Sequence, residues 1–232
     1  MPRLRPLLIF VCVFTACFAD SAFANKRTDP TAPSHKRSIA SKNAVAGKFD
    51  YYLMSLSWSP TFCQTHPDDK EQCGKKGYGF VLHGLWPQYE GGNGPQRCQT
   101  EDEPDGKTVA RAQAFMPNEQ LITHEWFMHG TCSGLKPQAF FDLADRAFAS
   151  VHVPPELQAP RTALQTDNNH LRAWLRSANP GLGDNMLTLH CSGGEFVEAR
   201  ICLDKNLTPR ACGSRVRNGC PASDTFTIPA TK

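Results

Sequence analysis

The sequence contains no apolar run long enough to cross a bilayer as a helix. Its longest such run, Leu7–Ala16, has 10 residues, whereas a spanning helix needs roughly 20. The sequence also contains no Cys-x-x-Cys pair, the spacing typical of structural zinc sites, and no internal repeat. These absences disfavour a membrane-spanning helix, a zinc site of this type and a repeat architecture.

The short apolar run has the surroundings of an export signal. Arg3 and Arg5 precede it, and the small-residue motif Ala22–Ala24 follows it, which is the order found in secretory signal peptides. We therefore predict a signal peptide over residues 1–24 and an exported protein, either periplasmic or secreted. Lipoprotein processing at Cys17 is the less favoured alternative.

The net charge of the remaining chain changes from positive to negative after residue 48. Residues 25–48 hold six Lys or Arg against one Asp, a net charge of +5, whereas residues 49–232 hold 17 Lys or Arg against 20 Asp or Glu, a net charge of −3. The first part is rich in Ser, Ala and Pro, so we predict a basic disordered leader. The second part suits one domain. Because this domain is net acidic, its charge alone does not indicate a nucleic-acid partner.

Eight cysteines remain after the predicted signal peptide is removed. An even number of cysteines in an exported chain is typical of disulfides and of an oxidising compartment. Eight cysteines allow 105 pairings, so their spacing does not give the connectivity. They are Cys63, Cys73, Cys98, Cys132, Cys191, Cys202, Cys212 and Cys220.

Strand patterns lie at both ends of the domain, and helical patterns lie between them. Apolar runs bounded by turn residues predict strands over 49–58, 78–86, 186–191, 196–203 and 225–228, with a loop over 90–106. Helical periodicity predicts helices over 109–115, 121–130, 137–147 and 167–178. This order predicts an α+β fold, in which a central, mostly antiparallel β-sheet packs with several α-helices in one disulfide-stapled domain.

The segment 124–129 (HEWFMH) concentrates side chains that carry protons. As a helix at ~100° per residue, it places Glu125 about 100° and His129 about 140° from His124, on one polar face, with both aromatic side chains toward the core. Imidazoles titrate near pH ~6.5, so one can be neutral while another is protonated. Two imidazoles in different protonation states can carry out general acid–base catalysis. A surface helix that happens to be polar is the structural alternative.

The same segment differs by one residue from the zinc-protease motif His-Glu-x-x-His. That motif brings two imidazoles four residues apart onto one ion, whereas His124 and His129 are five residues apart. We therefore predict no metal site and keep a metallohydrolase as an alternative function.

A second segment, 83–87 (HGLWP), lies in a predicted strand. A histidine in an apolar strand more often packs in the core than catalyses a reaction. Here, however, Gly84 allows close approach of another group, and Trp86 offers a flat surface for stacking. His83 is therefore a candidate catalyst if the fold brings the two segments together.

Together, the two segments resemble the active-site segments of the ribonuclease T2 family of secreted, disulfide-bonded ribonucleases. The resemblance extends over roughly residues 49–228. It implies metal-free endonucleolytic cleavage of single-stranded RNA with low base specificity, in which the ribose 2′-OH attacks its own phosphate to give a 2′,3′-cyclic phosphate. DNA lacks this nucleophile and is expected to remain uncut. We expect RNA as the partner, no cofactor and a monomer.

The resemblance also implies a role for each residue that matches a family motif. His129 matches the general base, His83 the general acid, Glu125 a residue that stabilises the pentacoordinate phosphate, and His124 a phosphate-binding residue. Base contacts are expected from Trp86, Gln88, Pro117 and Asn118. The implied disulfides are Cys63–Cys73, Cys98–Cys132, Cys191–Cys220 and Cys202–Cys212.

Met128 departs from the family pattern, since family members typically carry Lys there. The helical wheel places Met128 between the catalytic side chains, where a Lys would offer positive charge to the phosphate oxygens. We predict either an active but weakened enzyme or one in which a nearby Lys or Arg supplies the charge. A weakened or inactive member that acts by binding RNA or protein is the alternative.

Overall fold

Strand β1 (Tyr51–Trp58) organises the sheet, because it lies between β2 (Phe80–Gln88) and β5 (Glu195–Leu203) and is antiparallel to both. The structure, a computed structural model, describes residues 44–231 of the 232-residue chain. The predicted signal peptide and most of the predicted leader lie outside the described residues.

The full strand order is β2-β1-β5-β6-β3, and β4 pairs with β5 beside this path. The short strands are β3 (Leu164–Thr166), β4 (Leu187–Ser192) and β6 (Phe226–Ile228). All pairings are antiparallel except the contact of β5 with β6. The predicted α+β fold with a mostly antiparallel sheet in one domain is therefore confirmed.

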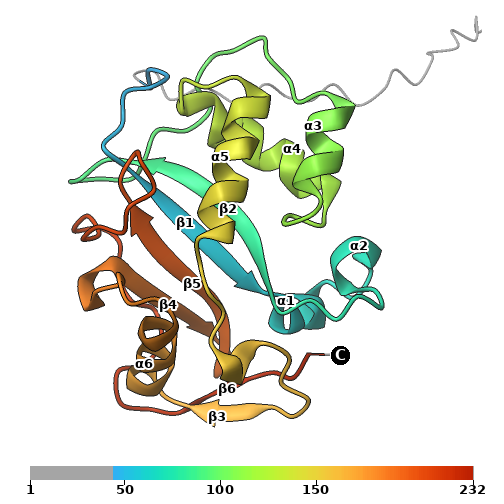
Figure 1. The fold of residues 1–232 in the computed structure, drawn as a ribbon, viewed down its shortest axis with the longest axis vertical. Coiled ribbons are helices and arrows are strands. Elements are labelled where there is room, and N and C mark those ends of the chain that lie inside the picture. Colours follow the sequence, from blue (N-terminus) through green and yellow to red (C-terminus); the bar gives the residue numbers. More distant parts are fainter. Residues whose placement is uncertain (1–43, 232) are drawn as a thin grey trace, which may run out of the picture. The chain divides into compact units, whose positions relative to one another are not determined.

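Helices α3 (Gly106–Ala112), α4 (Glu119–Met128) and α5 (Pro137–Ala149) lie together beside β2, while α6 (Asn168–Ala178) lies near β3 (Figure 1). Helix α5 begins with a proline and buries an aromatic and alanine stripe against the sheet. Within residues 44–231, no helix is both long and apolar enough to cross a membrane. The remaining helical turns are α1 (Ser59–Thr65), α2 (Lys70–Cys73) and the 3-10 turns η1 (Gly130–Cys132), η2 (Pro155–Leu157) and η3 (Asp184–Met186).

Several elements differ from the prediction for local reasons. The sequence pattern predicts no element at α1, α2 or β3, all of which are short. Helix α3 begins three residues early because the Asp105 side chain caps it, accepting a hydrogen bond from the Thr108 N–H at 2.8 Å. Helix α4 begins after its cap Asn118 and ends at Met128 rather than at Gly130.

Four disulfides stabilise the domain, two across 10 residues and two across 29 and 34 residues. They pair Cys63 with Cys73, Cys98 with Cys132, Cys191 with Cys220 and Cys202 with Cys212, the pairing that the family resemblance implies. The bond between Cys98 and Cys132 ties the loop after β2 to the turn after α4. The Gly47 N–H donates to the Cys132 carbonyl at 2.9 Å, so residues 44–48 of the predicted leader contact the domain.

Candidate active site

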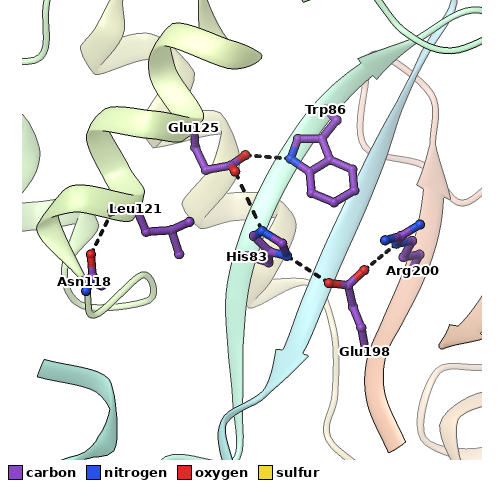
Figure 2. A network of polar contacts seen from close by, with 7 residues as sticks. All are labelled: His83, Trp86, Asn118, Leu121, Glu125, Glu198 and Arg200. Atoms are coloured by element: carbon purple, nitrogen blue, oxygen red, sulfur yellow. Dashed lines mark hydrogen bonds and ion pairs between the residues drawn. The ribbon is translucent and has the colours of Figure 1, made fainter. Parts of the chain in front are cut away.

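His83 occupies a β-bulge in the middle of β2. The pairing of β1 with β2 passes from Ser55 opposite Gly84 to Leu56 opposite Leu82, which leaves His83 without a partner. Such an extra residue interrupts the alternation of side chains along a strand. Leu82 therefore stays buried in the core, while the His83 side chain joins the polar network shown in Figure 2. The sequence predicts the strand but not its bulge.

Two buried carboxylates flank the His83 ring. Its Nδ1 lies 2.8 Å from Oε2 of Glu198, and its Nε2 lies 3.8 Å from Oε1 of Glu125 (Figure 2). Burial by itself lowers the pKa of His83, but the hydrogen bond to Glu198 and the charges of both carboxylates outweigh it. The pKa of His83 is therefore raised above its ordinary value of 6.5, which favours the imidazolium form.

Glu198 remains ionised although it is buried on β5. Burial alone raises the pKa of Glu198, but the hydrogen bond with His83 and the charges of Arg200 and His83 lower it to about 2. Arg200 stands two residues further along the same strand, and its Nε–H donates to the other oxygen of Glu198. Glu198 thus stays ionised, with one carboxylate oxygen bonded to Arg200 and the other to His83.

Glu125 approaches the same imidazole from α4. The carboxylate is 2% exposed, and its Oε2 accepts a hydrogen bond from the Trp86 Nε1–H at 2.6 Å. Burial is the main cause that raises the pKa of Glu125 to about 7, against the lowering effects of the His83 charge and the Trp86 hydrogen bond. A Cβ atom on Gly84 would lie 2.1 Å from the Trp86 Nε1 and 2.2 Å from the Glu125 Oε2. The contact between the two segments therefore requires glycine at position 84.

His129 lies directly after the end of α4, with φ −128° and ψ −48°. Its ring centroid is 5.3 Å from that of Trp86, and its buried Nδ1 has no hydrogen-bond partner among the described residues. Burial, together with the charges of His124 and His83, lowers the pKa of His129 to about 4. His129 is therefore neutral near pH 7 and able to accept a proton.

The predicted polar face of α4 is divided in the structure. His124 is exposed, and burial together with the charges of His83 and Arg97 lowers its pKa, whereas Glu125 is buried. Trp126 is buried as expected, but the prediction for Phe127 is wrong, because this side chain is 41% exposed. The buried residues of α4 follow a stripe through Ile122, Glu125 and Trp126, and Phe127 lies outside this stripe.

Arg97 provides a positive charge next to Met128. Its Nε–H donates to the Met128 Sδ at 2.9 Å, and its backbone N–H donates to the Met128 carbonyl at 3.0 Å. The charge of Arg97 also acts on His124. The guanidinium therefore lies beside the residue at which the family resemblance leads us to expect a lysine.

A groove of about 540 Å³ opens beside the two histidine segments. Trp86, Gln88 and His129 line one part of it. Gln88 accepts a hydrogen bond from the Gly94 N–H at 3.2 Å, and the Arg200 guanidinium carbon lies 5.3 Å from the centroid of the Trp86 ring. The groove thus combines an aromatic surface with amide and guanidinium groups.

Pro117 and Asn118 do not line this groove. Pro117 is buried. The Asn118 Oδ1 accepts a hydrogen bond from the Leu121 N–H at 2.8 Å (Figure 2), and its Nδ2–H donates to Asp69 at 2.7 Å. Both atoms of the Asn118 amide are therefore occupied, one in capping α4 and the other in a hydrogen bond with Asp69, the cap of α2. The structure does not bring either residue together with the histidines.

Two residues of the network, Glu198 and Arg200, were absent from the residues predicted for the site. Both lie on β5, a strand that the sequence predicts but that carries no recognisable motif. The available signal is the spacing of two charges at positions i and i+2, which places them on one face of a strand that is otherwise apolar after its first residue, Glu195.

The assembled site holds a proton donor and a proton acceptor near one another. His83 favours its protonated form, His129 favours its neutral form, and the hydrogen bond of Trp86 to Glu125 joins the two segments that carry them. Such a pair can deliver a proton on one side of a reacting group and remove one on the other. Within residues 44–231, no group of three or more His, Cys, Asp or Glu side chains is placed to hold a metal ion.

The chain is similar to ribonucleases in both sequence and fold. A model of the Ribonuclease T2 family matches residues 49–212. A ribonuclease from Aeromonas hydrophila is 45% identical over 113 residues, which cover 49% of this chain and 51% of that protein. A probable ribonuclease from Haemophilus influenzae is 29% identical over 182 residues, 72% of this chain and 62% of that protein. The alignments thus span about half to two thirds of these relatives. An RNase-related protein from Calystegia sepium has the same fold, with a TM-score of 0.65 at 21% identity, over 79% of this chain and 98% of that one.

Replacing Glu198 by Gln is expected to lower the pKa of His83 by roughly 1 pH unit or more, because a nearby carboxylate stabilises the imidazolium and Gln keeps the shape without the charge. NMR titration of the histidine ring signals measures this directly. The matched control is Glu195→Gln on the same strand, which should leave the His83 titration unchanged. An unaltered His83 pKa in Glu198→Gln would show that this hydrogen bond does not control the charge of the imidazole.

Proposed function

Because this chain belongs to the ribonuclease T2 family, we propose that it is an endoribonuclease that cleaves single-stranded RNA by attack of the ribose 2′-OH on the adjacent phosphate. The observation that carries the proposal is the juxtaposition of two histidines, around Trp86 and Glu125, whose pKa values are shifted in opposite directions. His83 lies on the side of Glu198 and is protonated, while His129 lies against Trp86 and is neutral.

The reaction uses these two protonation states directly. Neutral His129 accepts the proton of the 2′-OH as its oxygen attacks phosphorus, and the bond from phosphorus to the 5′ oxygen breaks. His83 gives its proton to that leaving oxygen. The products are a 2′,3′-cyclic phosphate and a free 5′-OH, and the two histidines exchange protons with water before the next cleavage. No metal ion is needed in this scheme.

Glu125 and Glu198 act differently on the same centre. With a pKa of about 7, Glu125 is largely protonated in mildly acidic solution, and a neutral carboxyl can donate a hydrogen bond to a phosphoryl oxygen where a carboxylate would repel it. Glu198 stays charged behind His83 and acts as a positioning residue, because it fixes the orientation and the charge of the imidazole. In this proposal His124, on the exposed side of α4, contacts the phosphate.

Substrate selection follows from the chemistry of the groove. Trp86 offers a stacking surface, and stacking tolerates every base, which supports low base specificity. Gln88 provides an amide for additional base contacts. DNA lacks the attacking hydroxyl, so it is expected to bind without being cut. The four disulfides are typical of an oxidising compartment, in support of export.

Digestion of RNA homopolymers in the presence of EDTA tests the proposal. We expect cleavage that is unaffected by the chelator, with 2′,3′-cyclic phosphate ends visible by ³¹P NMR, and no cleavage of matched 2′-deoxy polymers. Loss of activity in EDTA, or cleavage of the deoxy polymers, would instead support a metallohydrolase. Binding of RNA without any cleavage would support the alternative function of an inactive, RNA-binding family member.

The pH dependence of kcat/KM is expected to be bell-shaped. Activity should rise as the pH increases through about 4, where His129 loses its proton, and fall above pH 6.5 as His83 loses its own. His129→Ala should lose roughly 10²–10⁴-fold in activity together with the rising limb.

A substrate with a better leaving group distinguishes the role of His83 from that of His129. A uridine 3′-phosphate ester of p-nitrophenol needs little protonation on departure, so His83→Ala should lose much less activity on this ester than on RNA. His129→Ala should lose activity on both substrates, because each requires removal of the 2′-OH proton. Equal losses on both substrates in His83→Ala would contradict the assignment of His83 as the acid.

Arg97 is expected to supply the charge that Met128 does not. Arg97→Gln should lower the rate of RNA cleavage roughly 10²-fold, since removing one stabiliser of transition-state charge typically costs 10²–10³-fold. Adding Met128→Lys to Arg97→Gln should restore much of the rate, because it returns a cation to the same place. Arg161→Gln, an exposed arginine outside the site, is the matched control. An unchanged rate in Arg97→Gln would show that no cation is needed there.

A further inference from the structure

The groove beside Trp86 has a basic half that the proposed reaction does not use. Arg200, Arg215 and Arg217 line it, and no Asp or Glu does. This is the opposite of the net charge of −3 carried by residues 49–232, where 20 Asp or Glu stand against 17 Lys or Arg. A local cluster of guanidinium groups on a net acidic domain indicates a site for an anionic ligand, since guanidinium groups bind phosphate well.

Arg215 and Arg217 are free to bind such a ligand. Both are exposed, and within residues 44–231 neither forms an ion pair with a carboxylate. Arg210, earlier in the same part of the chain, shows the contrast: it pairs with Glu90, and its guanidinium lies over the Tyr51 ring. The charges of Arg215 and Arg217 are therefore not neutralised by an ion pair within the described part of the protein.

The segment 213–219 that carries these arginines is fixed to the sheet. Disulfides hold the residues on both sides of it, through Cys212 to β5 and through Cys220 to β4. The Asn218 Oδ1 accepts a hydrogen bond from the Leu189 N–H at 2.9 Å, which fixes the segment to β4 between these bonds. Because the backbone is already ordered, little conformational entropy is lost when the segment binds a ligand.

The position of the groove relative to the two histidines gives the direction of the RNA chain. His129 lines the groove and His83 does not. In the proposed reaction His129 takes the proton of the 2′-OH, so the nucleotide that carries this hydroxyl lies on the groove side. With its base on Trp86 and its 3′-phosphate between the histidines, this nucleotide extends its 5′ side toward Arg215 and Arg217.

We propose that Arg215 and Arg217 bind the RNA phosphate on the 5′ side of the nucleotide that carries the attacking 2′-OH, one nucleotide upstream of the scissile phosphate. His190, with no carboxylate among the groove residues, lines the same part of the groove. The segment follows residue 212, where the match to the family model ends. This assignment rests on the proposed function, which sets the direction of the chain.

Two ligands that cannot be cleaved isolate this contact. Calorimetry should show that adenosine 3′,5′-bisphosphate binds about 10-fold or more tightly than adenosine 3′-phosphate, since a charge-assisted contact contributes at least that factor. In Arg215→Gln/Arg217→Gln the two ligands should bind about equally. The matched control, Arg146→Gln/Arg161→Gln, removes the same charge from exposed positions outside the groove and should keep the preference.

The outcomes separate the upstream phosphate site from the proposed reaction, because binding of these ligands requires no cleavage. A wild-type protein that binds both ligands equally would overturn the site, and so would a double variant that keeps the preference, even if RNA is cut as proposed. A preference that disappears only in Arg215→Gln/Arg217→Gln would support the site, even if the RNA digestion failed. Circular dichroism of both double variants verifies that they are folded.

Discussion

The hydrogen bond between Glu198 and His83 is the interaction that most favours the charged form of both side chains. This hydrogen bond and the charge of Arg200 keep the buried carboxylate ionised, and the carboxylate raises the pKa of the imidazole. The positive charge of His83 then helps to lower the pKa of His129, whose Nδ1 has no hydrogen-bond partner within residues 44–231. One anion on β5 thereby contributes to opposite protonation states in two histidines from different segments. Burial is the main cause of the low pKa of His129, and this chain of charges adds to it.

Backbone geometry makes that arrangement possible. The bulge at His83 releases the side chain from the alternation of β2, so the strand can keep its apolar residues in the core and still present an imidazole to β5 and α4. At the next position, the absence of a Cβ atom on Gly84 leaves room for the contact of Trp86 with Glu125. The polar network therefore relies on two adjacent residues of β2, one with an unusual backbone register and one without a side chain.

The sequence predicted the parts of the site that lie in local motifs. His83, Glu125 and His129 stand in two short segments, and the fold class followed from strand and helix periodicity. Glu198, Arg200 and Arg97 could not be predicted in this way, because their roles depend on strand register and on a loop that folds against α4. The exposure of Phe127 has a similar origin, since a helical wheel gives the angles between side chains but not which angle faces the core.

Arg97 lies beside Met128, the position at which a lysine is typical of the family. Its guanidinium comes from the loop after β2 rather than from α4, and a flexible loop would hold a charge poorly. Cys98, the next residue after Arg97, is bonded to Cys132, and the Arg97 N–H donates to the Met128 carbonyl. These two links fix the loop to the end of the catalytic helix on both sides of the arginine. The disulfide thus has a chemical consequence as well as a structural one, because it holds a guanidinium beside the site at the place where the helix itself offers only a thioether.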